Sequence, residues 1–288
     1  MKNKVCIVTG ATSGIGLYVA GMLAQKGMHI VLACRNMEKA KAVCEKIKSK
    51  TGNPHVFCME LDLSSFNSIE SFAEKFRQKY GRLDILINNA GVICDTRRYS
   101  EQGFEMTMGV NYIGPYYLTQ LLMPHLYRAQ SARIINVSSV VGINSSMHEE
   151  VLDFYDLKPG LYAYTASKFA QVLYTIELAE RLSGSNITVN ALHPGVYGTN
   201  IWSGERPLTR YTKPLMKFFF PSPKNGAKAI THLATSPDLA KVTGALFMKT
   251  KKVAPKNGAL NDKLRKKLME YTQNAVEEAE KCKKNIAI

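Results

Sequence analysis

The chain has 288 residues, of which 45% are hydrophobic, and its formal net charge at pH 7 is +15. This length and apolar content are ample for the core of one large α/β domain or two small ones. Six scattered cysteines without a C-x-x-C pair argue against a disulfide framework and a zinc site, and they predict reduced thiols in a cytosol-like compartment.

The first 25 residues are expected neither to span a membrane nor to act as a secretory signal. The uncharged run 5–25 is long enough for a transmembrane helix, but it contains a glycine-rich turn together with Thr9, Thr12 and Ser13. A strand with no small-residue cleavage site directly follows the start "MKNK", so we expect no signal peptide. A cytoplasmic protein is the resulting expectation.

The stretch "TGATSGIG" at 9–16 predicts a phosphate-binding turn. The apolar run "KVCIVT" precedes it, and apolar residues at helical spacing follow it. A strand, a glycine turn and a helix in this order direct free backbone N–H groups and the positive end of the helix dipole at one spot. No Lys-Ser/Thr pair follows the glycines, so the turn is not a Walker loop. A turn that merely packs the helix closely on a sheet is the alternative.

Short β-rich runs alternate with amphipathic segments along the chain. The expected strands are 4–9, 29–34, 55–61, 83–88, 132–138, 187–193 and 244–248, and the expected helices include 36–50, 65–80, 103–128 and 163–182. Strands separated by helix-length connections form a parallel sheet that is covered on both faces. We therefore predict a single α/β domain with a doubly wound, Rossmann-type sheet of about seven strands and ligands at their carboxyl ends.

The predicted catalytic domain covers residues 1–250 and includes a substrate lid at about 200–223. Residues 251–288 are expected to form a basic helical extension that packs on this domain. The extension carries an apolar helical stripe made of Leu264, Leu268, Tyr271 and Ala275. Its positive charge therefore indicates a solvated face and no nucleic-acid partner, and a positive field would also attract the phosphates of a dinucleotide.

The end of the second expected strand reads "ACRN" at 33–36 and bears on the choice of dinucleotide. An NAD site would normally place Asp or Glu here to bind the ribose hydroxyls. Arg35 can instead pair with a 2′-phosphate through its guanidinium fork. The motif favours NADP(H) over NAD, and a solvent-exposed loop arginine is the alternative.

The segment "LYAYTASKFA" contains a candidate acid/base pair. Tyr164 and Lys168 are four residues apart on an expected helix and so share a face, whereas Tyr162 does not. A nearby ammonium would lower the pKa of the phenol from about 10, so that it could exchange protons with a carbonyl or alcohol oxygen. An ordinary surface Tyr/Lys pair is the alternative.

Five motifs in a fixed order resemble the short-chain dehydrogenase/reductase family. They are T-G-x-x-x-G-I-G at 9–16, "NNAG" at 88–91, "VSS" at 137–139, Y-x-x-x-K at 164–168 and "HPG" at 193–195. The similarity runs from residue 4 to about residue 248. The segments "ACRN", "TVNALHPG" and "SPDLAKVTGALF" are most similar to the retinol dehydrogenase-like branch of this family.

The resemblance implies the catalytic roles. Tyr164 would be the acid/base, Ser139 would polarise the substrate oxygen, and Lys168 would lower the tyrosine pKa while holding the nicotinamide ribose. Asn111 would link the lysine to a proton-carrying water, and an asparagine that kinks a long helix is its alternative. The implied reaction is R₂C=O + NADPH + H⁺ ⇌ R₂CHOH + NADP⁺, with reduction favoured in a reducing cytosol.

The resemblance also implies the cofactor site. Asp62 would meet the adenine through its side chain and Leu63 through its backbone, although an aspartate that merely ends a strand is the alternative. Asn89 would line the cofactor site, with a turn-forming asparagine as its alternative. No metal ligand is expected. The expected cofactor-binding set is Gly10, Thr12, Ser13, Gly14, Ile15, Gly16, Arg35, Asp62, Leu63, Asn89, Ala90, Gly91, Tyr164, Lys168, Pro194, Gly195 and Thr199.

The stretch after Thr199 is rich in large apolar side chains, and an apolar lid would suit a retinoid, a steroid or another lipophilic carbonyl or alcohol. Simple cover for the sheet is the alternative. Basic residues on the opposite side resemble a membrane-surface helix, but Pro214 interrupts it. Peripheral contact with an intracellular membrane and a homodimer are left open. The apolar residues are Trp202, Leu208, Tyr211, Leu215 and 218–220, and the basic ones are Arg206, Arg210, Lys213 and Lys217.

Two other functions stay compatible with this fold: a reductase of small carbonyls or quinones, and a non-enzymatic dinucleotide sensor. A complete set of Asn111, Ser139, Tyr164 and Lys168 argues against the sensor. A hydrolase is disfavoured because the sequence contains no G-x-S-x-G nucleophile turn.

Overall fold

The computed structural model describes residues 1–197, 201, 221–256 and 258–286, and it is built on an eight-stranded sheet of order β3-β2-β1-β4-β5-β6-β7-β8. Strands β1 to β7 pair in parallel, and β8 pairs antiparallel to β7. The 3-2-1-4-5-6 part is the doubly wound order. The strands are β1 (Val5–Thr9), β2 (His29–Cys34), β3 (Val56–Glu60), β4 (Ile85–Asn88), β5 (Ala132–Val137), β6 (Ile187–His193), β7 (Leu246–Met248) and β8 (Lys251–Val253).

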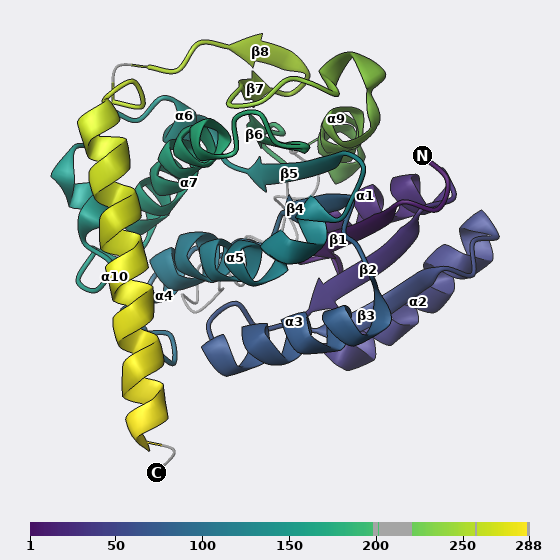
Figure 1. Ribbon diagram of the computed structural model, residues 1–288, viewed down its shortest axis with the longest axis horizontal. Helices are drawn as coiled ribbons and strands as arrows, with labels where there is room; N and C mark the ends of the chain where they lie inside the picture. The colour runs from purple at the N-terminus through teal and green to yellow at the C-terminus, as the bar shows by residue number, and fades with distance from the viewer. Residues whose placement is uncertain (198–200, 202–220, 257, 287–288) are drawn as a thin grey trace.

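Helices cover both faces of the sheet (Figure 1). One face carries α1 (Gly14–Ala24), α2 (Met37–Thr51) and α9 (Pro223–Thr235), and the other carries α3 (Phe66–Lys79), α5 (Gly114–Tyr127) and α7 (Leu161–Arg181). The shorter elements are α4 (Met106–Met108), a π-helix at Gly109–Ile113, α6 (Val140–Ile143) and 3₁₀ turns at Glu149–Leu152 and Pro237–Leu239.

The strand sequences are continuously apolar because both faces of the sheet are buried. In β1, Cys6 and Val8 pack into the core under α1 and α9, whereas Val5 and Ile7 pack into the core under α3 and α5. Successive side chains of a strand point to opposite faces, so a short run such as "VCIVT" serves two cores at once.

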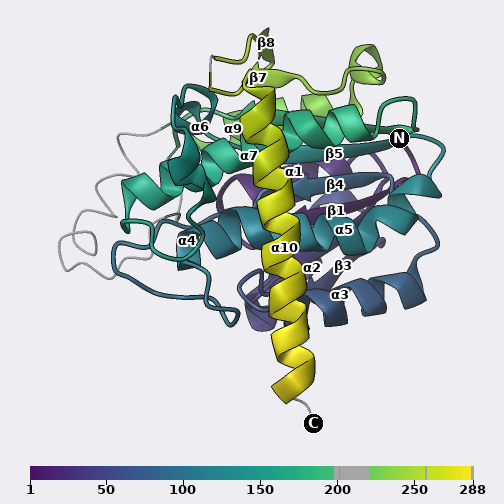
Figure 2. The ribbon, with the colours of Figure 1, turned by 60° about the vertical axis from the view of Figure 1, so that its left-hand side comes forward.

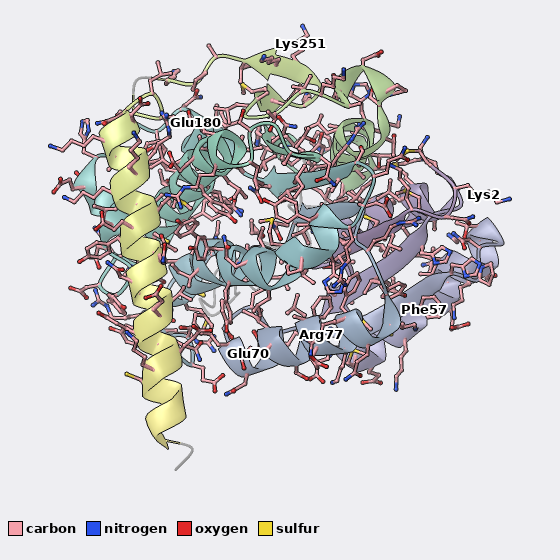
Figure 3. All side chains as sticks on the ribbon, viewed as in Figure 1. Lys2, Phe57, Glu70, Arg77, Glu180 and Lys251 are labelled. Atoms are coloured by element: carbon pink, nitrogen blue, oxygen red, sulfur yellow. The ribbon has the colours of Figure 1, made fainter. Side chains whose placement is uncertain are left out.

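The last helix, α10 (Asp262–Ile286), lies across the outer side of α7, as Figures 1 and 2 show. Leu264, Leu268 and Ala275 are buried, whereas Tyr271 is 49% exposed. The helix is also tied down by polar contacts. Arg265 Nη2 lies 2.8 Å from Glu180 Oε1, and the hydroxyls of Tyr112 and Thr272 are 2.7 Å apart. Figure 3 labels Glu180 beside the first turns of α10.

The predicted fold class is confirmed: each of the seven expected strands is present, in one doubly wound sheet. Strand β8 was not predicted, because it has three residues of which Lys251 and Lys252 are exposed. The expected helix 103–128 is divided into α4, a π-helix and α5. Among the helices of the described ranges, none has the length and apolar content needed to cross a bilayer.

Candidate active site

A cavity of about 1030 Å³ lies at the carboxyl ends of the parallel strands. Its wall includes the last or next residues of β1, β2, β4, β5 and β6, so it sits where ligands bind in doubly wound sheets. The predicted site residues that line it are Gly10, Thr12, Ser13, Gly14, Ile15, Arg35, Asp62, Leu63, Asn89, Ala90, Gly91, Ser139, Tyr164, Lys168, Pro194 and Gly195. Thr199 lies outside the described residues, as do positions 202–220 of the predicted lid.

The glycine turn leads from β1 into α1 at one end of this cavity. Gly10 has a φ of +66°, and a Cβ there would lie 2.9 Å from the Cα of Ala90, so no other residue fits. The N-cap residue Ser13 makes no side-chain capping bond, and the first turn of α1 holds no acidic residue. The backbone N–H groups and the dipole of this helix are therefore available to an anion.

Gly16 does not line the cavity and instead lies behind the turn. A Cβ at this position would be 2.5 Å from Asn89 Nδ2 and 2.7 Å from the carbonyl oxygen of Gly10. The third glycine of the motif therefore allows α1 to approach the sheet closely. The packing role considered for the whole turn is thus the role of this one position.

Thr9 joins the two loops that form the floor of the cavity. Its Oγ1 accepts hydrogen bonds from the backbone N–H groups of Asn89 and Ala90, each at 2.9 Å. Asn89 Nδ2 in turn donates to the carbonyl oxygen of Thr9 at 2.8 Å. The side chain of Asn89 thus holds the turn together, which is the alternative role foreseen for it. The structural role of Thr9 was missed, and its only sequence signal is a hydroxyl at the strand end.

Arg35 and Lys39 line the cavity where β2 leads into α2. Asn36 caps this helix by accepting a hydrogen bond from Lys39 N at 2.8 Å, so both cations are placed around the helix N-terminus. Two exposed positive charges beside free backbone N–H groups suit a phosphate. Lys39 was missed at the sequence level, although its spacing of four residues from Arg35 on a helix start was a usable signal.

Asp62 and Leu63 form the wall of the cavity after β3. One carboxylate oxygen of Asp62 accepts from Ser64 N at 2.9 Å and from Ser64 Oγ at 2.7 Å. This local turn fixes the direction of the carboxylate. The turn-forming role considered for Asp62 and a position in the cavity wall are therefore found together.

Tyr164 lies in the first turns of α7 and faces the cavity, whereas Tyr162 is 42% exposed and does not line it. Ser139 lines the same cavity, and its side chain opposes the rise in the pKa of Tyr164. Ser138 has another task, because its Oγ donates to the carbonyl oxygen of Lys168 at 3.0 Å and fastens α7 to β5. The two serines of "VSS" thus divide into one that faces the cavity and one that supports it.

Lys168 is almost fully buried beneath the cavity wall. Its Nζ donates to the carbonyl oxygen of Val137 at 2.9 Å and to Gln171 Oε1 at 3.0 Å, and it lies 5.8 Å from the ring centre of Tyr164. Burial without a carboxylate partner disfavours the ammonium form and lowers the pKa of Lys168 to about 7. The lysine can therefore exchange a proton at neutral pH.

The balance of charges at Tyr164 differs from the expectation that Lys168 lowers the pKa of the phenol. Burial raises the pKa of Tyr164 above its ordinary value of 10.0, and the hydrogen bond with Ser139 only opposes this rise. The cause is the burial that the tyrosine shares with the lysine, since a lysine with a pKa near 7 carries only part of its charge at neutral pH. The phenol is thus held in its protonated form.

Asn111 lies behind the cavity wall in the π-helix. Its Oδ1 accepts from Val92 N at 2.8 Å, and its Nδ2 donates to Val92 O and to Ser167 Oγ, each at 3.0 Å. A Cβ at Gly91 would lie 3.4 Å from Asn111 Oδ1 and 3.5 Å from Lys168 Nζ, so the amide and the ammonium flank the same glycine. The asparagine therefore sits in a distorted helix, as its alternative role has it, and its amide lies near the lysine; the link through a water stays a prediction.

The loop after β6 contributes Pro194, Gly195 and Tyr197 to the wall. Tyr197 Oη donates to the carbonyl oxygen of Pro194 at 3.0 Å, which braces the loop. Tyr197 was not predicted as a site residue. Another part of the wall is apolar and is made of Cys94, Met106, Val110, Val140, Val141, Leu161 and Ile201.

In the parts of the chain that the structure describes, no group of three or more His, Cys, Asp or Glu side chains is arranged to hold a metal ion. All six cysteines are free thiols, and only Cys282 is exposed.

Comparisons with known proteins identify the family of this chain. The profile of the short chain dehydrogenase family matches residues 4–208. Retinol dehydrogenase 13 of Homo sapiens is 41% identical over 274 residues, which cover 93% of this chain and 83% of that protein. Polyprenol dehydrogenase of Homo sapiens is 37% identical over 92% of this chain and 83% of its own length.

Solved structures show the same fold. A short chain dehydrogenase from Escherichia coli in complex with NADPH has a TM-score of 0.70 at 26% identity and covers 87% of this chain and 98% of its own. An uncharacterised protein from Mycobacterium paratuberculosis has a TM-score of 0.75 at 26% identity and covers 96% and 94%. The family expected from the five motifs, and its retinol dehydrogenase-like branch, are therefore confirmed.

Proposed function

This chain belongs to the short chain dehydrogenase family, and we propose that it interconverts a carbonyl and an alcohol with NADP(H), on a lipophilic substrate such as a retinoid or a steroid. One observation carries the proposal. Ser139, Tyr164 and Lys168 line the same cavity as the glycine turn and Arg35. A proton donor and a phosphate site in one cavity are what dinucleotide-dependent reduction requires.

The cavity residues fit the dinucleotide. The glycine turn places the N-terminus of α1, whose N-cap makes no side-chain capping bond, at the cavity wall, where its backbone N–H groups would hold a pyrophosphate. Arg35 and Lys39 line the cavity where the second strand ends. Among the described residues of the cavity wall, Asp62 is the only acidic one that could take the ribose hydroxyls instead, and its carboxylate accepts a hydrogen bond within its own turn. These two cations support a 2′-phosphate and hence NADP(H).

In the proposed mechanism, three side chains of the cavity each take one role. The bound cofactor supplies or accepts a hydride at the substrate carbon. Ser139 holds the substrate oxygen by a hydrogen bond, and Tyr164 Oη gives that oxygen its proton during reduction. Lys168 then returns a proton toward the tyrosine, because a group with a pKa of about 7 is both donor and acceptor at neutral pH.

The raised pKa of Tyr164 favours reduction at neutral pH. A protonated phenol is ready to donate to a carbonyl oxygen, whereas oxidation of an alcohol needs the phenolate as its base. We therefore propose that the protein works as a carbonyl reductase at neutral pH and as an alcohol dehydrogenase only under more alkaline conditions.

The proposed substrate class rests on the wall and on the relatives. The apolar side chains of Cys94, Met106, Val110 and Leu161 line the cavity together with Tyr164. Relatives named retinol dehydrogenase and polyprenol dehydrogenase act, by their names, on long apolar alcohols. A wall of this kind gains binding free energy in proportion to the apolar area that the substrate buries.

The test is a substrate panel with both nicotinamide cofactors. All-trans-retinal, a steroid ketone, hexanal and a quinone are each offered with NADPH or NADH, and cofactor oxidation is recorded. The proposal expects turnover with NADPH that is fastest for retinal or the steroid. Faster turnover of hexanal or the quinone would contradict the proposed substrate class. Equal use of NADH would contradict the assignment of NADP(H) as the cofactor.

A further inference from the structure

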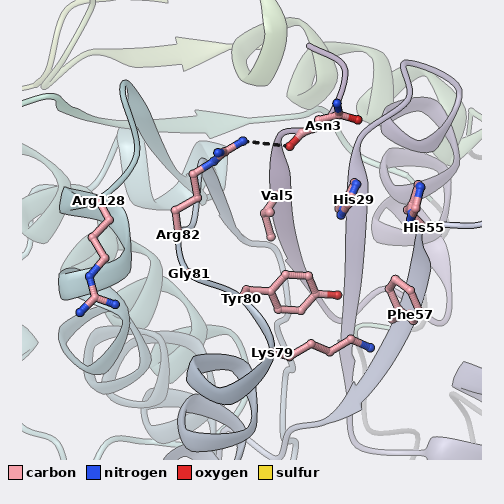
Figure 4. Close-up of a pocket in the computed structure, with 10 residues that line it drawn as sticks. All are labelled: Asn3, Val5, His29, His55, Phe57, Lys79, Tyr80, Gly81, Arg82 and Arg128. Atoms are coloured by element: carbon pink, nitrogen blue, oxygen red, sulfur yellow. Dashed lines mark hydrogen bonds between the residues drawn. The ribbon is translucent and has the colours of Figure 1, made fainter.

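A second cavity, of about 620 Å³, lies at the opposite end of the sheet (Figure 4). Its wall is made of residues at the starts of β1, β2 and β3, including Val5, His29 and Phe57, and of the segment 79–82 that follows α3. Strand β1 separates it from the active-site cavity, because Val5 lines the former and Thr9 the latter. At roughly 3.3 Å per residue, the four steps from Val5 to Thr9 separate the two walls by about 13 Å along the strand.

Aromatic rings form much of this second cavity. The imidazoles of His29 and His55 are stacked, with ring centres 4.2 Å apart and planes 10° from parallel. In Figure 4 the rings of Tyr80 and Phe57 lie below this pair, on the same side of the strands. The cavity thus offers ring faces and edges from β2, from β3 with the residue before it, and from the loop after α3, which suits a flat ligand.

Positive charge surrounds these rings. Lys79 Nζ lies 3.7 Å from the ring centre of Phe57 and 5.8 Å from that of Tyr80, with no ion pair to any described residue. Arg82 and Arg128 also line the cavity, whereas no acidic residue does within the described ranges. Burial lowers the pKa of His29, and the neighbouring His55 and Arg82 lower it further.

Arg82 is held in place with donors to spare. Its Nε donates to Asp84 Oδ2 at 3.1 Å, and its Nη2 donates to the carbonyl oxygen of Asn3 at 3.1 Å, the bond drawn in Figure 4. Asp84 is buried and also accepts from Val5 N at 2.8 Å, so it is occupied inside the fold. A guanidinium has five N–H donors, and a fixed one presents the others without a further loss of freedom.

Tyr80 adds an unsatisfied polar group. The residue is 8% exposed, and its hydroxyl has no hydrogen-bond partner among the described residues. Burial raises the pKa of Tyr80 to about 12, so the hydroxyl is a donor at neutral pH. Figure 4 shows it pointing toward β2 and β3, between Val5 and Phe57. Buried polar groups without a partner are rare and indicate a missing one.

We propose that this pocket binds a small aromatic carboxylate, a planar ring with one anionic group. The ring of the ligand would pack against the imidazoles and against the face of Phe57 that Lys79 now covers. The carboxylate of the ligand would accept hydrogen bonds from Lys79 and Arg82. A bare phosphate would leave the ring faces without a partner, and a neutral ring would leave the cations without one. The proposal is independent of the proposed oxidoreductase activity.

The test measures binding of four probes to the full chain at pH 7.5 by calorimetry and by amide chemical shifts. The probes are benzoate, cyclohexanecarboxylate, benzamide and inorganic phosphate. We expect saturable binding of benzoate, about tenfold tighter than each of the others, because each lacks either the ring or the charge. Shifts are expected at residues of the second cavity. Equal affinity for benzoate and phosphate, or no saturable binding of benzoate, would overturn the proposal.

Charge-reversal variants locate the site. Lys79→Glu is expected to weaken benzoate binding about tenfold, since it removes a charge-assisted bond and adds repulsion. Lys75→Glu is the matched control, because Lys75 is exposed one turn earlier on α3 and does not line the cavity. Equal losses in both variants would indicate the general field alone and overturn the proposal. Tyr80→Phe should also weaken binding while keeping the ring, and melting temperatures verify that each variant is folded.

Competition with the cofactor separates the two cavities. Benzoate affinity is expected to be the same with and without saturating NADPH, since the two pockets lie at opposite ends of the sheet. Displacement of benzoate by NADPH would place the probe in the active-site cavity and would overturn the proposal, even if the oxidoreductase activity were demonstrated.

Discussion

In the part of the chain that the structure describes, two tyrosine–lysine pairs have the same distance from ammonium nitrogen to ring centre but different surroundings. At the carboxyl ends of the strands, Lys168 Nζ lies 5.8 Å from the ring centre of Tyr164. At the amino ends, Lys79 Nζ lies 5.8 Å from the ring centre of Tyr80. Lys168 is buried and anchored to Val137 and Gln171, whereas Lys79 is exposed.

The difference teaches that the pair itself does not make a proton donor. Tyr164 and Ser139 together face a cavity of about 1030 Å³, whereas the hydroxyl of Tyr80 is buried without a partner among the described residues. Burial raises both tyrosine pKa values, but only the first tyrosine has a serine that can share a substrate oxygen with it. The open cavity in front of Tyr164 and the serine beside it distinguish this proposed acid from Tyr80, a proposed binding group.

Removal of one hydroxyl is the change that would break this comparison most clearly. Tyr164→Phe keeps the ring but removes the transferable proton, so we expect turnover to fall by roughly 10²- to 10⁴-fold, the usual loss of a general acid. NADPH binding should persist. Steady-state rates and a direct titration of NADPH measure the two effects.

The matched control for this change is Tyr162→Phe. Tyr162 is 42% exposed on the same helix and does not line the cavity, so its variant should retain nearly full activity. If Tyr164→Phe were as active as the unmodified protein, the assignment of the acid would fail and the dinucleotide sensor would become the better function.

The cofactor end of the cavity predicts the next largest effect. Arg35→Asp should raise the KM for NADPH by about ten- to a hundredfold and shift the preference toward NADH, because a charge-assisted bond to a phosphate is lost. Lys39→Ala should act in the same direction, whereas Lys41→Ala, an exposed lysine outside the cavity wall, should not. Initial rates with both cofactors are the readout, and equal use of NADH by the unmodified protein would contradict the role of Arg35.

The raised pKa of Tyr164 predicts opposite pH profiles for the two directions. Alcohol oxidation needs the phenolate, whose fraction below its pKa grows about tenfold per pH unit, so its rate should rise steeply between pH 7 and pH 10, whereas carbonyl reduction should not rise. Rates in both directions with the same substrate pair give the profiles. An oxidation rate that is flat or falls over this range would show that burial does not control the proton on this tyrosine.

The smallest expected effect is a pH-dependent difference in stability. The pKa of Lys168 is about 7 in the folded protein and 10.5 ordinarily, so between these values the unfolded chain binds more protons than the folded chain. Stability contributed by this site therefore rises with pH in this window. Relative to Lys168→Met, the melting temperature of the unmodified protein should increase by up to about 3 °C per pH unit from pH 7 to pH 9. An exposed-site control, Lys79→Met, should show no such trend.

Much of the fold followed from sequence patterns because they report on burial. Runs such as "VCIVT" and "HIVLAC" are apolar throughout, and the structure buries them on both faces of a parallel sheet. Strand β8 gave no such signal, since it is a short edge strand with two exposed lysines. The π-helix around Asn111 also could not be read from the sequence, because one extra residue in a helical turn leaves the apolar pattern nearly unchanged.

The site residues that belong to sequence motifs were predictable. The residues brought to the site only by the packing of distant segments were not. The five motifs bring Gly10, Ser139 and Tyr164 to one cavity wall, but they say nothing of Lys39, Tyr197 or the binding of Asn89 to Thr9. The pKa of Lys168 was beyond the sequence for the same reason. Its value depends on burial and on the lack of a nearby carboxylate, which only the packed structure defines.

The central claim is that, in the cavity at the carboxyl ends of the strands, NADPH transfers a hydride to a carbonyl carbon while Tyr164 supplies the proton. The most direct measurement uses NADPH deuterated at the transferring position of the nicotinamide, with retinal and the unmodified protein, and analyses the alcohol by mass spectrometry. The account predicts one deuterium on the carbinol carbon of the product, at a rate that Tyr164→Phe reduces by roughly 10² or more. NADPH that binds but leaves its deuterium on the cofactor, with every carbonyl of the panel, would contradict it.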